Sequence, residues 1–171
     1  AQPGSRDPNR YVLQILIALN RITETEEPLK RGVELAPAGD RSLAISAIPR
    51  AYARVSDKKM ASMVVEQALA AYLANPATAS SAWTTVGRMR LAAGDAAGAL
   101  DAAQKGQVAD IRYEGPPLVA LELMDPKLPA AEVLVQKYLN GNPRSLPEVR
   151  MTYARALLDA QRYGEASAQL Q

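Results

Sequence analysis

Residues 81–100 read SAWTTVGRMRLAAGDAAGAL, and this stretch decides the fold of the chain. It predicts a helix, a turn at Gly94 and the start of a second helix, because glycine accepts the left-handed conformation that ends many helices. Residues 153–166, YARALLDAQRYGEA, repeat that order. Ala99 and Ala166 occupy equivalent places and are 67 residues apart, twice a period of about 34. Such a period indicates stacked helical hairpins, an architecture that offers a surface for another protein.

The composition suits closely packed helices. Apolar residues make up 48% of the 171 residues, whereas aromatic residues make up only 5% and phenylalanine is absent. An alanine-rich interior without phenylalanine fits helices better than a β-sandwich. No window of 18 consecutive apolar residues occurs, so we expect no membrane-spanning helix.

The absence of two residue types excludes several classes of function. The chain has neither cysteine nor histidine, which excludes zinc sites of the usual kind, thiol catalysis and Ser-His-Asp hydrolysis. No paired carboxylates and no phosphate-binding loop stand out, so we predict a non-enzymatic protein with no cofactor and no metal. The balance of 20 basic against 18 acidic residues, a net charge of +2, argues against a nucleic-acid partner.

Turn signals divide the chain into about ten predicted helices in five antiparallel pairs. The helices are expected at residues 11–22, 25–36, 42–55, 59–74, 79–93, 96–109, 118–124, 128–140, 148–160 and from 163 onward, and the third of them begins at either Asp40 or Ser42. Thr25 is expected to cap the helix that follows it. Pro49 is expected to bend or break the helix that contains it.

The domain organisation follows from the same signals. Residues 1–8 are polar and turn-rich, which predicts a loop or a frayed end. The rest is predicted to be a single helical repeat domain, 9–171, with units at 9–39, 40–77, 78–112, 113–144 and 145–171. The chain stops inside an expected helix, so we interpret it as a fragment of a longer array.

The pattern resembles the tetratricopeptide repeat (TPR). That family's unit has an early aromatic residue, a glycine at the turn, small alanines in the second helix and a closing proline. The residues that carry the resemblance best are Trp83, Gly87, Gly94 and Ala99 in one unit and Tyr153, Tyr163 and Ala166 in the last. Pro49 and the absence of a closing proline at Ile111 depart from it. The resemblance implies a right-handed α-solenoid with a concave face that binds proteins.

The alanine-rich, divergent repeat sequence is also similar to the sequences of repeat lipoproteins of Gram-negative bacteria. That resemblance implies a periplasmic or outer-membrane-associated adaptor for a protease or another envelope complex. Any lipid anchor would lie outside this fragment, and a cytoplasmic location is the alternative.

A stack of this kind has a concave face formed by the first helix of each pair. Residues expected to point there are Gln14, Arg50, Arg54, Thr84, Arg88, Met151 and Arg155. Arginine recurs in three units, and a row of guanidinium groups can hold the carboxylates of an acidic peptide bidentately. Apolar contacts are expected from Leu91, Met151 and Leu158. The alternative is that these arginines are ordinary exposed helix residues.

Together these features predict a scaffold or adaptor that binds a peptide or helix of another protein on its concave face. The alternative function is a structural spacer or a self-association segment of a larger protein, so an oligomer is an open expectation.

Overall fold

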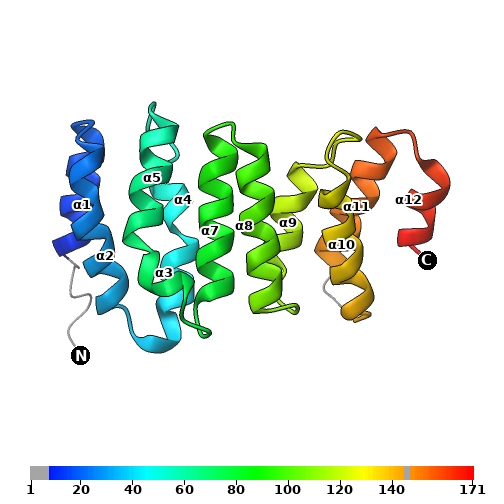
Figure 1. Ribbon diagram of the computed structural model, residues 1–171, viewed down its shortest axis with the longest axis horizontal. Coiled ribbons are helices and arrows are strands. Elements are labelled where there is room, and N and C mark those ends of the chain that lie inside the picture. Colours follow the sequence, from blue (N-terminus) through cyan, green and yellow to red (C-terminus); the bar gives the residue numbers. More distant parts are fainter. Residues whose placement is uncertain (1–7, 145–146) are drawn as a thin grey trace.

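The computed structural model describes residues 8–144 and 147–171, and within these ranges it contains helices and no β-strand. This confirms the predicted all-α class. Of the loop expected over residues 1–8, residues 1–7 lie outside the described part, and Pro8 begins the first helix. The helices are arranged along the long axis of the molecule from α1 at one end to α12 at the other, with α5 beside α3 and α4 (Figure 1).

Most of the helices begin and end close to the expected turn signals. Their bounds are α1 Pro8–Ala18, α2 Glu26–Leu35, α3 Arg41–Ser46, α4 Ile48–Ala51, α5 Lys58–Ala68, α6 Ala70–Leu73, α7 Ala79–Ala92, α8 Ala96–Ala109, α9 Gly115–Glu122, α10 Pro129–Gly141, α11 Pro147–Asp159 and α12 Tyr163–Gln169. Short 3-10 helices at Ile22–Thr25 and Ala38–Asp40 precede α2 and α3. The turn before α8 has the predicted form, because Gly94 has a φ of 82°.

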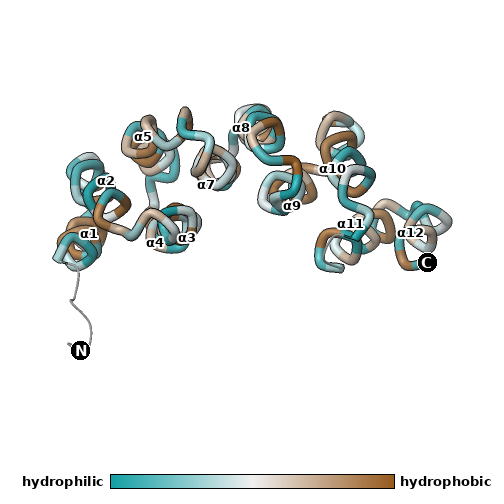
Figure 2. Tube along the Cα trace, turned by 90° about the horizontal axis from the view of Figure 1, so that it is seen from below, coloured by the Kyte–Doolittle hydropathy of each residue, from teal (hydrophilic) through white to brown (hydrophobic). Residues whose placement is uncertain are grey.

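Many contacts join helices that are neighbours in the sequence, but α3 and α4 pack mainly against α7 and not against α5, the helix that follows them. The most extensive contact joins α7 to α8, and α1 with α2, α8 with α9, α9 with α10 and α11 with α12 also pack together. Figure 2 shows α2, α5, α8 and α10 along one side of the molecule and α1, α3, α4, α9 and α11 along the other. α7 also contacts α3, α4, α5, α6 and α9, so it lies at the centre of the row.

Two predicted helices are interrupted. The helix expected over 42–55 is broken between α3 and α4, because Pro49 lacks an N–H and is tolerated only in the first turn of α4. The continuous helix expected over 59–74 is wrong, since α5 ends before Leu69, whose φ of −92° and ψ of 1° are not helical. With this break, Leu69 and Tyr72 are both buried.

Thr25 does not act as the predicted side-chain cap. It occupies the N-cap position of α2, but its side chain makes no capping bond. Instead the Thr25 hydroxyl donates to the Ile22 carbonyl oxygen at 2.6 Å and accepts from the Tyr52 hydroxyl at 2.8 Å. Burial raises the pKa of Tyr52 to about 12, so this donor stays protonated. The bond ties the turn before α2 to the end of α4.

The hydrophobic core has two parts that meet at α7 and α8. Val86 and Met89 of α7 belong to the N-terminal part, and Ala99 and Ala103 of α8 belong to the C-terminal part. The helices approach closely at Gly87, where a Cβ atom would lie 3.3 Å from the Ala99 carbonyl oxygen. Small residues at this crossing therefore hold the two halves of the molecule together.

Candidate functional site

Three of the predicted arginines remain available to a partner. Arg50 of α4, Arg54 just after it and Arg155 of α11 are exposed, and none of them forms an ion pair with another described residue. Gln14 on α1 is exposed as well, and Met151 on α11 is 47% exposed. These five residues lie on α1, α4 with the turn after it, and α11, which Figure 2 shows along one side of the molecule.

Thr84 is not a surface residue, and its prediction as a binding residue is wrong. It is only 4% exposed, and its hydroxyl donates to the Ser80 carbonyl oxygen at 2.8 Å. A Cβ atom added to Gly115 would lie only 2.8 Å from the Thr84 side chain, so the start of α9 covers Thr84. The physical reason is that α7 is enclosed by helices on both sides.

Arg88 is half-buried on the same helix. Its Nη1 atom lies 4.0 Å from the Glu122 carboxylate of α9. Because both side chains are partly exposed, the pair contributes little stability and can exchange for another carboxylate. Leu91, expected to offer an apolar contact, packs against the C-terminal core instead.

The charges differ between the two sets of helices. The helices α1, α3, α4, α7, α9 and α11 carry seven arginines, no lysine and three acids, whereas α2, α5, α6, α8, α10 and α12 carry six basic and seven acidic residues. The seven arginines are Arg10, Arg41, Arg50, Arg88, Arg90, Arg150 and Arg155. Arg90 is occupied, because it pairs with Glu66 at 2.6 Å and donates to the Gly98 carbonyl oxygen. The other six arginines give the helices α1, α3, α4, α7, α9 and α11 their excess of positive charge.

Exposed apolar side chains lie beside the free arginines. Leu43 of α3 is 71% exposed, and Arg50 on the next helix, α4, is exposed as well. On α11, Leu158 is 46% exposed and lies one turn from Arg155. Mixed arginine and aliphatic surfaces of this kind suit a partner segment with acidic and apolar residues.

A polar network joins the last three helices. The Tyr153 hydroxyl of α11 donates to Glu132 of α10 at 2.6 Å, and it accepts from the Gln136 amide at 3.2 Å. Arg162, in the turn before α12, donates to Glu132 at 2.8 Å and also pairs with Glu165. The Arg162 guanidinium, together with the Tyr153 hydroxyl, lowers the pKa of the Glu132 carboxyl. Burial raises the pKa of Tyr153, and its bond to Glu132 adds to that shift.

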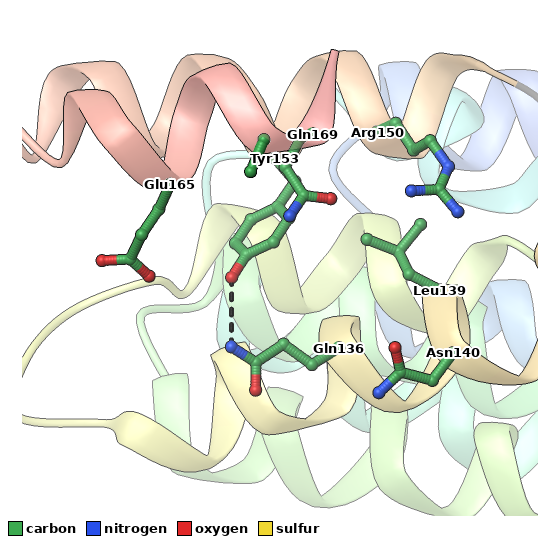
Figure 3. A pocket seen from close by; sticks show the side chains of 8 residues that line it. Gln136, Leu139, Asn140, Arg150, Tyr153, Glu165 and Gln169 are labelled. Atoms are coloured by element: carbon green, nitrogen blue, oxygen red, sulfur yellow. Dashed lines mark hydrogen bonds between the residues drawn. The ribbon is translucent and has the colours of Figure 1, made fainter. Parts of the chain in front are cut away.

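A hollow of about 370 Å³, the C-terminal hollow, opens between α10, α11 and α12. The residues that line it are Gln136, Leu139, Asn140, Arg150, Tyr153, Glu165, Ala168 and Gln169. Figure 3 shows Arg150 and Glu165 at opposite ends, with Tyr153 and Gln169 between them. The sequence analysis did not identify this hollow, because its residues come from three helices that no local motif connects.

A second hollow of about 440 Å³ lies between the loops that precede α9 and α11. Its lining includes Arg112, Glu114, Tyr138, Asn142 and Arg144, and the Asn142 amide donates to the Ile111 carbonyl oxygen at 2.9 Å. A carboxylate therefore already lies among the arginines of this hollow.

The chain matches no family model, no curated protein and no solved structure.

The described residues also offer no metal site or membrane span. Nowhere in 8–144 and 147–171 do three acidic residues gather in a way that could hold a metal ion. The helices in the same ranges are all too short or too polar to cross a bilayer. What the surface does offer is hydrogen-bond donors with positive charge, and these recognise carboxylates.

Proposed function

We propose that this protein is a right-handed α-solenoid of the tetratricopeptide type and a non-enzymatic scaffold or adaptor. It binds an acidic peptide or helix of another protein on the face formed by the first helix of each pair. The arrangement of the helices along the long axis and the many contacts between sequence neighbours support the solenoid. The excess of arginine in the first helices supports the choice of partner.

The exposed, unpaired guanidinium groups of Arg50, Arg54 and Arg155 are the observation that carries this proposal. A guanidinium can accept a carboxylate through two parallel hydrogen bonds, and its weak hydration lowers the cost of removing water. Arginine alone, without lysine, therefore favours specific carboxylate recognition over a general positive potential.

Peptide display tests the proposed partner chemistry. Peptides selected on the wild-type protein from a random library are expected to be rich in Asp and Glu. The triple variant Arg50→Gln, Arg54→Gln, Arg155→Gln is expected to bind them at least about tenfold more weakly, because each lost charged hydrogen bond removes about 1.5 kcal/mol or more. Isothermal titration measures the affinities.

A matched variant separates recognition from net charge. Lys30→Gln, Lys59→Gln and Lys137→Gln remove the same charge from exposed positions on the second helices. That variant should bind as the wild type does. Equal losses in both variants would mean that only the total charge matters, and the proposed face would be wrong.

Self-association is the second candidate function, and α1 favours it. No residue of α1 is buried. Four apolar side chains are 46% to 58% exposed and lie on one face of this helix, within an arc of about 100° around its axis: Tyr11, Val12, Ile15 and Leu19. In the interior of the row, the corresponding helices are covered on both sides, as α7 is. A second copy of the chain could cover this apolar face.

Sedimentation velocity at several concentrations tests self-association. If α1 is the interface, the wild type should dimerise with rising concentration, and Ile15→Asp should shift it to monomer by placing a charge in the apolar face. The melting temperature of the monomer should hardly change, since Ile15 is 58% exposed. Gln14→Asp adds the same charge beside this face and should leave the dimer intact. A monomeric wild type would exclude this function.

A further inference from the structure

Arg150 is the charged group of the C-terminal hollow that lacks a partner. It is half-buried on α11, and no hydrogen bond or ion pair joins it to another described residue. Among the described residues that line the hollow, Glu165 is the only carboxylate, and it lies at the opposite end from Arg150 (Figure 3). Glu165 is already paired with Arg162. Its nitrogens are accessible to solvent, because Arg41 Nε is the one buried side-chain nitrogen or oxygen atom that lacks a partner among the described residues. An anion can therefore reach the Arg150 guanidinium and form charged hydrogen bonds with it.

Apart from the Tyr153 hydroxyl, which is already bonded to Glu132, the remaining polar groups of the hollow are carboxamides. Gln136, Asn140 and Gln169 reach it from α10 and α12 (Figure 3). Gln136 uses its amide nitrogen to donate to Tyr153, which leaves its carbonyl oxygen as an acceptor. The side-chain amides of Asn140 and Gln169 form no hydrogen bond with another described residue. A carboxamide offers one acceptor and two donors, so it can pair with the N–H and C=O groups of a peptide backbone.

The walls of the hollow are fixed before any ligand arrives. Leu139 and Tyr153 are only 5% and 2% exposed, so their positions are set by the core. Arg162 bridges α10 and the turn before α12 through its bond to Glu132. A site built on packed helices and braced by such bonds keeps its geometry better than one on loops.

We propose that the C-terminal hollow binds a short extended peptide segment with one acidic side chain. Arg150 receives the carboxylate, and the three carboxamides pair with the peptide backbone. This inference rests on the proposed function as a binder of acidic segments, and it names a second point of attachment. The volume of about 370 Å³ accommodates one acidic side chain with its adjoining peptide groups. The second hollow is a weaker candidate, because Glu114 opposes an anion there.

The hollow lies away from the row of first-helix arginines. Arg150 and Arg155 are five residues apart on α11, which places them about 140° apart around the helix axis. Arg150 faces α10, whereas Arg155 is exposed on the other side. The two arginines can therefore be tested independently.

The test uses the full chain and two acetylated, amidated tripeptides, Ala-Glu-Ala and Ala-Gln-Ala. In NMR titrations, the Glu peptide should shift the side-chain N–H signals of Arg150, Asn140 and Gln169 to saturation. The Gln peptide should bind at least about tenfold more weakly, because it cannot form the charged hydrogen bonds. Arg150→Gln should weaken binding of the Glu peptide by a similar factor, whereas Arg155→Gln should leave it unchanged.

Further variants guard against misfolding and separate the two proposals. Ala168→Trp fills the hollow from an exposed position on α12 without adding charge, and it should abolish binding while the circular dichroism melt stays unchanged. Equal affinity of wild type and Arg150→Gln, or shifts confined to Arg155, would overturn the inference. If library-selected peptides still depend on Arg50, Arg54 and Arg155, the proposed function stands even when the tripeptide result is negative.

Discussion

Replacing Gly87 by leucine should lower the free energy of unfolding by about 2 kcal/mol or more. Leucine gains about 0.8 kcal/mol of helix propensity over glycine. Its side chain, however, would start 3.3 Å from the Ala99 carbonyl oxygen, 3.5 Å from Ala102 and 3.6 Å from Val119. Forcing the extra carbons into this crossing costs about 3 kcal/mol or more, since the opposing atoms include backbone. The melting temperature should fall by roughly 4–8 °C.

Two other variants show that packing, not the loss of glycine, causes the effect. Gly87→Ala should be nearly neutral, because a single methyl group needs only a small shift of its neighbours. Gly164→Leu lies in α12, where nothing occurs within 4 Å of an added Cβ atom, and it should be neutral or slightly stabilising. Thermal unfolding followed by circular dichroism measures all three. A fully stable Gly87→Leu protein would mean that α7 and α8 do not cross as closely as described.

The elements that the sequence predicted best are those fixed by local chemistry. The helix expected over 96–109 agrees with α8, because Gly94 supplies the positive φ and the Asp95 carboxylate accepts from the Gly98 N–H at 2.8 Å. Pro49 interrupts its helix for an equally local reason. Gly87 was singled out in the sequence as part of the repeat pattern, and in the structure it lies where α7 and α8 approach closely.

The failures concern side chains whose surroundings are distant in the chain. Helical periodicity places Thr84 on the outward side of α7 but cannot show that α9 covers it. Arg155 and Arg150 look alike in the sequence, although only Arg150 reaches the C-terminal hollow. The bond between Glu132 and Arg162 spans 30 residues, and no pattern within one hairpin predicts it.

Removing the Tyr153 ring should produce the largest loss of stability. Tyr153 is 2% exposed and belongs to the C-terminal core, so Tyr153→Ala should cost about 3–5 kcal/mol, as for other large aromatic deletions. Because repeat units are stabilised mainly by their neighbours, the damage should concentrate in α10, α11 and α12. Hydrogen exchange measures this directly: amides in these helices should lose protection, while those in α5 keep it. Uniform loss across the chain would show that the array unfolds as one unit.

Tyr153→Phe isolates the hydroxyl and predicts a change with pH. The pKa of Glu132 lies below its ordinary value in the folded protein, first because of Arg162 and then because of the Tyr153 hydroxyl. Its contribution to stability is therefore complete above the unfolded pKa of about 4.3 and is lost as the pH falls through the lowered folded value. Without the hydroxyl, the folded pKa rises toward the ordinary value. Tyr153→Phe should thus lose about 1 kcal/mol at pH 7, and this difference should shrink in acid, once Glu132 is protonated in both proteins. A difference that stayed constant across the acid range would show that the hydroxyl stabilises the fold without acting on the Glu132 carboxylate.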